Sequence, residues 1–290
     1  MTAPFAVMVA PNGARRGKAD HPALPLTAGE LAREAARCHE AGAAAIHLHV
    51  RDGEGRHVLD ADLYRAATRA VRAEVGEAMV VQITTEAVGL YAPAAQMALV
   101  DELVPESVSI ALREIMPDVA AEAAAAAFFA RLATRPVLTQ IIVYSAEELA
   151  RLDDVMARGI IPDVPRPNVL AVLGSYAGRE AAPDDFDAFL AAGLARHPFM
   201  VCAFGRHEAA CAAAAVIHGG HMRIGFENNL ILPDGRLASH NGDIVAAGIA
   251  AAAGSARPLA SADDLRRLWH TPLPPVPAGA MSGASSRRPE

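Results

Sequence analysis

The 290-residue chain is poor in cysteine and positive charge and has no long apolar run, and each shortage excludes a class of protein. Its three cysteines, Cys38, Cys202 and Cys211, have unrelated spacings, which excludes a disulfide scaffold and predicts reduced core thiols in a cytoplasmic protein. The net charge is −7 and basic residues cluster only at 15–18, so a nucleic-acid partner is not expected. No stretch of about 18 strongly apolar residues exists, and no membrane span is expected.

Short apolar runs alternate with helical patterns over most of the chain. We expect strands over residues 5–10, 43–50, 78–84, 106–111, 136–143, 168–173, 198–204 and 221–227. We expect helices over residues 27–42, 60–74, 92–103, 117–133, 145–158, 183–195, 206–218 and 241–253. Eight strand–helix units predict a single-domain α/β fold, the (β/α)8 TIM barrel, over residues 1–270. An open doubly wound sheet is the alternative, but no Gly-x-Gly-x-x-Gly follows the first strand.

The last 20 residues differ from the rest. Residues 271–290 are dominated by proline, glycine and serine, which predicts an extended or disordered tail.

Two histidines near the end of the second expected strand form the strongest candidate site. Because side chains alternate along a strand, His47, His49 and Arg51 share one face. Neutral imidazoles at this spacing can converge on one metal ion, and they suit zinc. The alternative is a pair of hydrogen-bonded core histidines.

A third ligand is expected from the last strand. Arg223, Gly225 and Glu227 alternate onto one face there, with Glu227 at the strand's end. The eighth strand of a closed barrel neighbours the first, so Glu227 lies near His47 and His49 and completes a catalytic zinc set with an open position. The alternative is that Glu227 only pairs with Arg223 or Arg51, while Gly225 leaves room for a ligand.

Other polar groups follow the remaining strands. At the end of the third strand, Thr84, Thr85 and Glu86 can orient a substrate or act as a base. The loop after the first strand carries Arg15 and Arg16, which favour an anionic substrate. Phosphate of a cofactor such as coenzyme A is expected at two glycine-containing segments, Gly205-Arg206 and Gly219-Gly220.

Three motifs in the same order resemble the β-keto acid cleavage enzyme family. They are Lys18…His21-Pro22-Ala-Leu-Pro25-Leu-Thr27, Gly42…His47-Leu-His49-Val-Arg51-Asp52 and Gly219-Gly220-His221-Met-Arg223-Ile-Gly225-Phe-Glu227-Asn228-Asn229. The resemblance runs from the first strand to about Trp269. It implies a zinc-dependent (β/α)8 barrel, a homotetramer, that converts a β-keto acid and acetyl-CoA into a new acyl-CoA and acetoacetate.

The resemblance also implies roles for individual residues. The zinc ligands fall on His47, His49 and Glu227, the catalytic arginine on Arg223, and a substrate-binding hydroxyl at or near Thr84 or Thr85. Substrate contacts are further expected around Arg15, Arg51 and Ser109.

One position departs from the family pattern. In the family member that acts on an amino-bearing substrate, an aspartate that serves as base follows the zinc-binding glutamate, and here the residue is Asn228. An amide cannot usefully take a proton near neutral pH, so Asn228 only orients the substrate and Glu86, Arg223 or a zinc-bound water is the base, or turnover is slow. With Arg15 and Arg16 in the first loop, the substrate is expected to end in a neutral or anionic group.

Two other functions stay open on sequence grounds. One is a metal-dependent aldolase or hydrolase barrel that does not use CoA, and dependence of turnover on acetyl-CoA separates it from the first function. The other is a non-catalytic barrel that binds a metal or metabolite.

Overall fold

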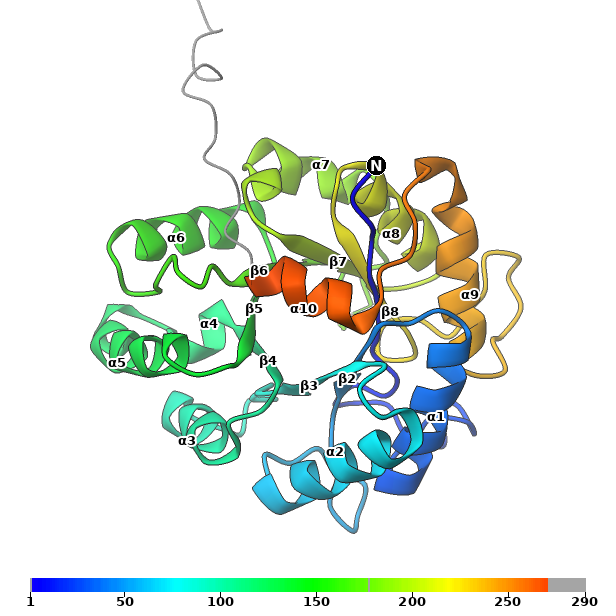
Figure 1. Cartoon of the computed structure of the whole chain (residues 1–290), viewed down its shortest axis with the longest axis horizontal. Coiled ribbons are helices and arrows are strands. Elements are labelled where there is room, and N and C mark those ends of the chain that lie inside the picture. Colours follow the sequence, from blue (N-terminus) through cyan, green and yellow to red (C-terminus); the bar gives the residue numbers. More distant parts are fainter. Residues whose placement is uncertain (1, 177, 271–290) are drawn as a thin grey trace, which may run out of the picture.

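The computed structural model describes residues 2–176 and 178–270, so the expected tail at 271–290 lies outside the described residues. Its eight parallel strands close into a barrel in chain order, each strand paired with the next and β8 with β1 (Figure 1). The strands are β1 Val7–Val9, β2 Ala45–Leu48, β3 Val80–Thr84, β4 Ser107–Ala111, β5 Leu138–Val143, β6 Asn168–Leu173, β7 Phe199–Ala203 and β8 His221–Ile224. The (β/α)8 prediction is confirmed.

Helices alternate with the strands and surround the barrel (Figure 1). The α-helices are α1 Ala28–Glu40, α2 Ala61–Val75, α3 Pro93–Leu103, α4 Leu112–Ile115, α5 Glu122–Ala133, α6 Ala146–Ala157, α7 Asp185–Ala191, α8 Glu208–Ile217, α9 Asn241–Ala251 and α10 Ala262–His270. Three short 3₁₀ helices are η1 Val119–Ala121, η2 Leu194–Arg196 and η3 Ala253–Ser255. None of the helices in the described part of the chain has the length and apolar character that a bilayer span requires.

The expected elements are present with shifted ends. Thr27 caps α1 and forms a capping box with Glu30, as its sequence predicts. The helix expected over 117–133 is divided into η1 and α5, and the one-turn α4 and the final α10 were not expected. A single turn such as α4 is too short to show helical periodicity.

The apolar core has two layers. The outer layer lies between strands and helices and includes Ile46, Leu48 and Val50, the residues predicted to face the helices. The inner layer fills the barrel with alternating strand side chains, among them Met8 and Met200. All three cysteines are buried and free.

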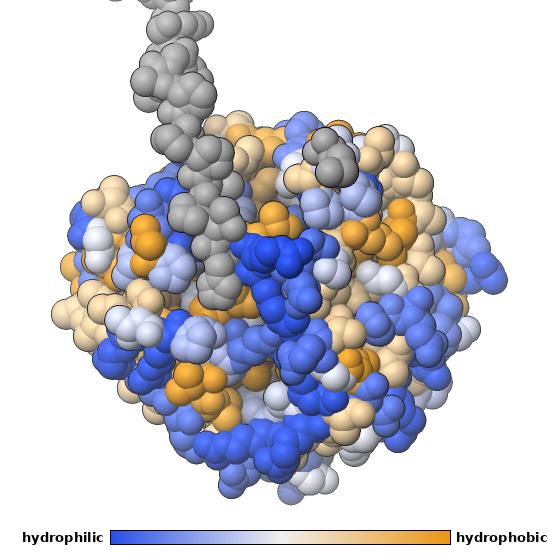
Figure 2. Space-filling model, viewed as in Figure 1, coloured by the Kyte–Doolittle hydropathy of each residue, from blue (hydrophilic) through white to orange (hydrophobic). Residues whose placement is uncertain are grey.

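Helix α10 covers the end of the barrel at which the strands begin. Its Leu265 and Trp269 are buried in the inner core, and its Arg266 pairs with Glu77 and Glu106 on the outer side. Figure 2 shows the hydrophilic surface that results over α10. The polar site described next lies toward the opposite end, where the strands finish.

Candidate metal centre and active site

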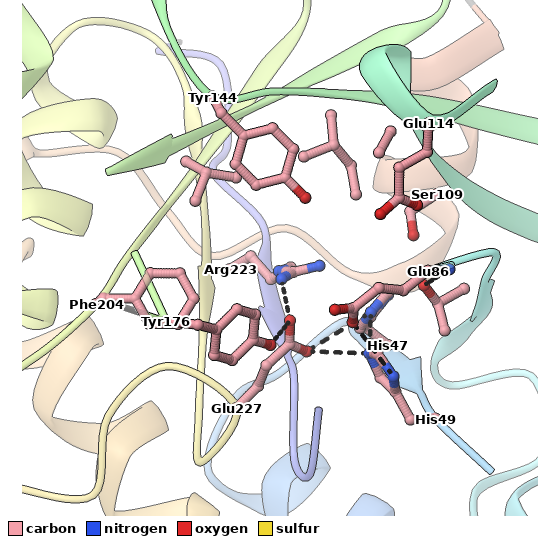
Figure 3. Close-up of a pocket in the computed structure, with 14 residues that line it drawn as sticks. His47, His49, Glu86, Ser109, Glu114, Tyr144, Tyr176, Phe204, Arg223 and Glu227 are labelled. Atoms are coloured by element: carbon pink, nitrogen blue, oxygen red, sulfur yellow. Dashed lines mark hydrogen bonds and ion pairs between the residues drawn. The ribbon is translucent and has the colours of Figure 1, made fainter. Parts of the chain in front are cut away.

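Two imidazoles at the end of β2 point into the barrel and face each other (Figure 3). His47 lies in β2 and His49 follows it directly, and both are almost fully buried. Their Nε2 atoms are 3.0 Å apart. The strand-alternation argument therefore placed both side chains correctly.

A chain of amides inside the barrel orients His47. Its Nδ1 lies 2.8 Å from Oε1 of Gln82 on β3, and Gln82 in turn donates to Ser107 and Gln140. Gln140 donates to Asn168 on β6. Because the amide nitrogen of Gln82 is engaged as a donor, its oxygen accepts from Nδ1–H of His47, and the Nε2 lone pair of His47 faces the centre.

His49 is fixed through its backbone. The Asn12 amide donates to the carbonyl of His49 at 2.9 Å and to that of Pro25 at 3.0 Å, and its oxygen accepts from the His49 N–H. Asn12 thereby extends the pairing of β1 and β2 beyond the last strand residues. The side chain of His49 then directs Nε2 to the centre, while its Nδ1 is 3.8 Å from the carboxylate of Glu86.

Glu227 reaches the centre from a turn, which corrects the expected strand. β8 ends at Ile224, and the backbone at Gly225 has φ +143° before a turn closed by bonds from Asn228 and Asn229 to the Gly225 carbonyl. A Cβ on Gly225 would lie 2.5 Å from the Ala10 carbonyl oxygen. Gly225 therefore makes room for the backbone of the first loop, not for a ligand.

The three side chains have the spacing of metal ligands. Oε2 of Glu227 lies 3.6 Å from Nε2 of His47 and 3.4 Å from Nε2 of His49, and it is buried without a hydrogen-bond partner in the described part of the chain. Bonds of about 2.0–2.1 Å to a tetrahedral zinc ion place ligand atoms about 3.3 Å apart. The observed separations of 3.0, 3.4 and 3.6 Å match this value, so the residues fit a zinc-like ion.

Burial and charge at the centre favour a neutral His47 imidazole and an ionised Glu227 carboxylate, the protonation states that bind a metal. Burial and the Arg223 guanidinium hold the pKa of His47 well below its usual value, so this imidazole stays neutral. Burial opposes ionisation of Glu227, but the charge of the Arg223 guanidinium outweighs it and holds the pKa of that carboxyl well below its usual range. The alternative role for Glu227, an ion pair with Arg223, is also present at 2.7 Å but uses only Oε1.

A pocket opens over this centre (Figure 3). Besides the histidines, five sequence-predicted residues line it: Thr84, Glu86, Ser109, Arg223 and Glu227. Arg15 does not line the pocket, but its Cζ lies 4.7 Å from the ring of Tyr176, which does. Burial raises the pKa of Glu86, and His49 opposes this shift.

Other predicted residues lie outside the pocket lining. Thr85 donates to the carbonyl of Ser109. The guanidinium of Arg51 donates to the carbonyls of Gly13 and Ala14, so Arg51 braces the first loop.

Arg16 and Asn228 also differ from the expected arrangement. Arg16 donates to the carbonyls of Phe226 and Asn228 and does not line the pocket. The Asn228 side chain is buried, and its amide atoms have no hydrogen-bond partner among the described residues.

The expected phosphate site does not form as a unit. Gly205 and Arg206 follow β7 at the end of the barrel that carries the pocket, and Arg206 is exposed and lies 3.6 Å from Glu180. Gly219 and Gly220 precede β8 and therefore lie at the opposite end, where the Phe199 ring packs against Gly220. The helix α8 separates the two pairs, which the sequence argument overlooked.

Several pocket residues were missed. Tyr144 follows β5, Tyr176 follows β6, and Glu114 comes from α4. Their shared signal is a position just after a strand, where a barrel places its active site. The segments after β4, β5 and β6 carry no recognisable motif in the sequence, so these three residues were not predicted.

With this geometry established, comparison with protein families gives one decisive match. Residues 4–270 match the beta-keto acid cleavage enzyme family. The chain belongs to this family. It is an enzyme that cleaves a β-keto acid, as the three sequence motifs predicted.

Curated relatives span nearly the same length. The 3-keto-5-aminohexanoate cleavage enzyme of Fusobacterium nucleatum is 29% identical over 88% of this chain and 94% of its own. The 3-oxoadipate:acetyl-CoA acetyltransferase of Cupriavidus necator is 24% identical over 94% of this chain and 96% of its own. The 3-dehydrocarnitine:acetyl-CoA trimethylamine transferase of Rhizobium meliloti is 27% identical over 75% of this chain and 80% of its own.

Among solved structures, the fold resembles that of ObcA. Its complex with oxaloacetate has a TM-score of 0.66 and 16% identity, and the match covers 86% of this chain and 67% of ObcA. At this identity the likeness concerns the fold alone.

Proposed function

We propose that the enzyme holds a zinc ion at His47, His49 and Glu227 and uses acetyl-CoA as its co-substrate. In the reaction, R–CO–CH₂–COO⁻ and acetyl-CoA give R–CO–S-CoA and acetoacetate. The observation that carries the metal is the unpartnered, buried Oε2 of Glu227 at ligand spacing from two imidazole nitrogens. The two relatives named for acetyl-CoA transfer support the co-substrate.

A bound metal supplies Lewis-acid stabilisation of the negative charge that develops on the keto oxygen when the C2 proton leaves. Arg223 supplies the recognition of the substrate carboxylate. Its Nε and Nη1 are buried and have no hydrogen-bond partner among the described residues, so both N–H groups are free to donate to an anion.

Glu86 is our candidate for the group that moves the C2 proton. The pocket has three carboxylates, and Glu227 is engaged by Arg223. One oxygen of Glu114 accepts from the Ala87 N–H and from Gln96. Glu86 lies beside His49 and its raised pKa suits a base, whereas Asn228 cannot serve as one.

The far wall of the pocket favours a substrate whose distal group donates hydrogen bonds. Ser109 Oγ is buried and has no hydrogen-bond partner within the part of the chain that the structure describes, and Glu114 and Tyr144 lie on the same side (Figure 3). Arg15 is close enough to lower the pKa of Glu114, but burial outweighs it and raises that pKa. This differs from the neutral or anionic end expected from Arg15 and Arg16, because neither arginine lines the pocket and the Arg16 guanidinium is directed to backbone carbonyls.

The test is formation of acyl-CoA by the purified full chain from acetyl-CoA and β-keto acids that end in an amino, methyl or carboxylate group. We expect products with acetyl-CoA present, best turnover with the amino-bearing acid, and a loss of at least about 100-fold in Glu86→Gln. Cleavage without acetyl-CoA would instead favour an aldolase or hydrolase. Binding of zinc without turnover of any acid would favour a non-catalytic barrel.

The assembly state is a separate proposal. We propose a homo-oligomer, a tetramer on the family resemblance, and a mass measurement by light scattering in solution tests it.

A further inference from the structure

The two oxygens of Glu227 have different surroundings. Oε2 faces His47 and His49 and has no hydrogen-bond partner among residues 2–176 and 178–270. Oε1 accepts from Arg223 Nη2 at 2.7 Å and from the Tyr176 hydroxyl at 3.2 Å. A carboxylate held in this way has one oxygen free for a metal and the other withheld by two donors (Figure 3).

Tyr176 is itself fixed from two sides. Its ring packs on Phe204 in a T-shaped contact with centroids 4.5 Å apart, and Arg15 lies over the ring. The ring therefore joins the end of β7 to the loop after β1, and its hydroxyl is held against Glu227. This packing pre-organises the hydrogen bond, because little side-chain freedom is left to lose when the bond forms.

We propose that Tyr176 is a positioning residue for Glu227, which holds Oε1 so that the carboxylate binds the metal through Oε2 alone. This inference rests on the metal centre of the proposed function. A single-oxygen contact keeps a further coordination position open for the substrate. Partners of metal ligands contribute 10- to 100-fold to metal affinity in comparable sites, and the Tyr176 hydroxyl is such a partner.

The pocket contains a matched control for this hydroxyl. Tyr144, like Tyr176, is a half-buried tyrosine with an arginine over its ring, Arg113 at 3.5 Å, and it makes no hydrogen bond to Glu227. Tyr176→Phe and Tyr144→Phe each remove one oxygen atom and keep the ring, so its packing and stacking are retained. Only the first removes a donor from Oε1.

The experiment measures the zinc dissociation constant of the metal-free full chain by competition with a chromophoric chelator. We expect a dissociation constant about 10-fold higher in Tyr176→Phe and within twofold of wild type in Tyr144→Phe. Cobalt(II) spectra of the same proteins report the ligand arrangement, and the absorption bands are expected to shift in Tyr176→Phe alone. Circular dichroism confirms that each variant is folded at the temperature used.

Two results would overturn the proposal. One is a wild-type zinc affinity and cobalt spectrum in Tyr176→Phe. The other is an equal loss of affinity in both variants, which would show a general effect of the pocket. Absence of zinc binding in wild type is a different result, because it refutes the metal centre of the proposed function and this inference with it.

Discussion

Gly13 lies against Glu227, the metal ligand that we propose, and its replacement by alanine is a quantitative test of the site. The backbone at Gly13 has φ +59°, and a Cβ there would lie 2.6 Å from Cγ of Glu227 and 3.3 Å from its Cα. The first distance is about 0.8 Å shorter than ordinary contact at 3.4 Å. Because the backbone of Glu227 is also close, the side chain cannot simply rotate away.

The magnitude follows from these distances. Metal–ligand distances in working sites hold to about 0.2 Å, so a shift of about 0.8 Å removes Oε2 of Glu227 from coordination. We expect the zinc dissociation constant of Gly13→Ala to rise by at least about 100-fold. This is more than the effect of removing a side chain that only hydrogen-bonds to a metal ligand. The left-handed φ adds about 1–2 kcal/mol of instability in the metal-free protein.

Gly17 supplies the control, because it lies in the same loop and a Cβ added there would meet open space. Chelator competition measures zinc affinity, and urea unfolding of the metal-free proteins measures stability. Gly17→Ala is expected to match wild type in both. Equal zinc affinity in Gly13→Ala and Gly17→Ala would refute the argument that Glu227 is placed by this contact.

Three further predictions concern other parts of the molecule. Gln82→Leu removes the acceptor for Nδ1–H of His47, so zinc affinity should fall about 10- to 100-fold; unchanged affinity would show that this bond does not orient the ligand. Burial, with Arg257 adding to it, lowers the pKa of His221 from 6.5 to about 3. The contribution of the neutral imidazole to the free energy of unfolding is therefore complete above pH 6.5 and is lost as the pH falls toward 3. Between pH 7 and 5 the free energy of unfolding of wild type should fall by about 2 kcal/mol more than that of His221→Asn, whose asparagine still accepts from the Ala6 N–H. Urea unfolding at each pH measures both, and parallel pH profiles of the two proteins would contradict this. Arg206→Ala should raise the KM for acetyl-CoA about 10-fold without changing zinc affinity, and an unchanged KM would remove Arg206 from the CoA site.

The convergence of His47, His49 and Glu227 could be predicted because it depends on two regular features. Alternation along a strand places His47 and His49 on one face, and closure of the barrel brings the end of β8 beside β1 and β2. Glu227 was predicted although β8 stops three residues before it, because the turn that follows still leads into the centre. The predicted position of Glu227 beside the histidines therefore did not depend on where β8 ends.

The rest of the site depends on contacts between segments far apart in the sequence. Tyr176 contacts Glu227 only because two loops meet above the barrel, and no local pattern at Tyr176 indicates this. Arg51 carries a charge that suggested substrate binding, but nearby backbone carbonyls engage it. Charge and residue type predict what a side chain can do, whereas loop conformation decides which partner it has.

The central claim is that cleavage of a β-keto acid requires the metal held by His47, His49 and Glu227. The most direct measurement is acetoacetate release from acetyl-CoA and a β-keto acid by the same protein before metal removal, after chelation and after return of one equivalent of zinc per chain. We predict that activity disappears on chelation and returns with zinc, and that Glu227→Gln is inactive in all three states. Full activity after complete metal removal would contradict the account.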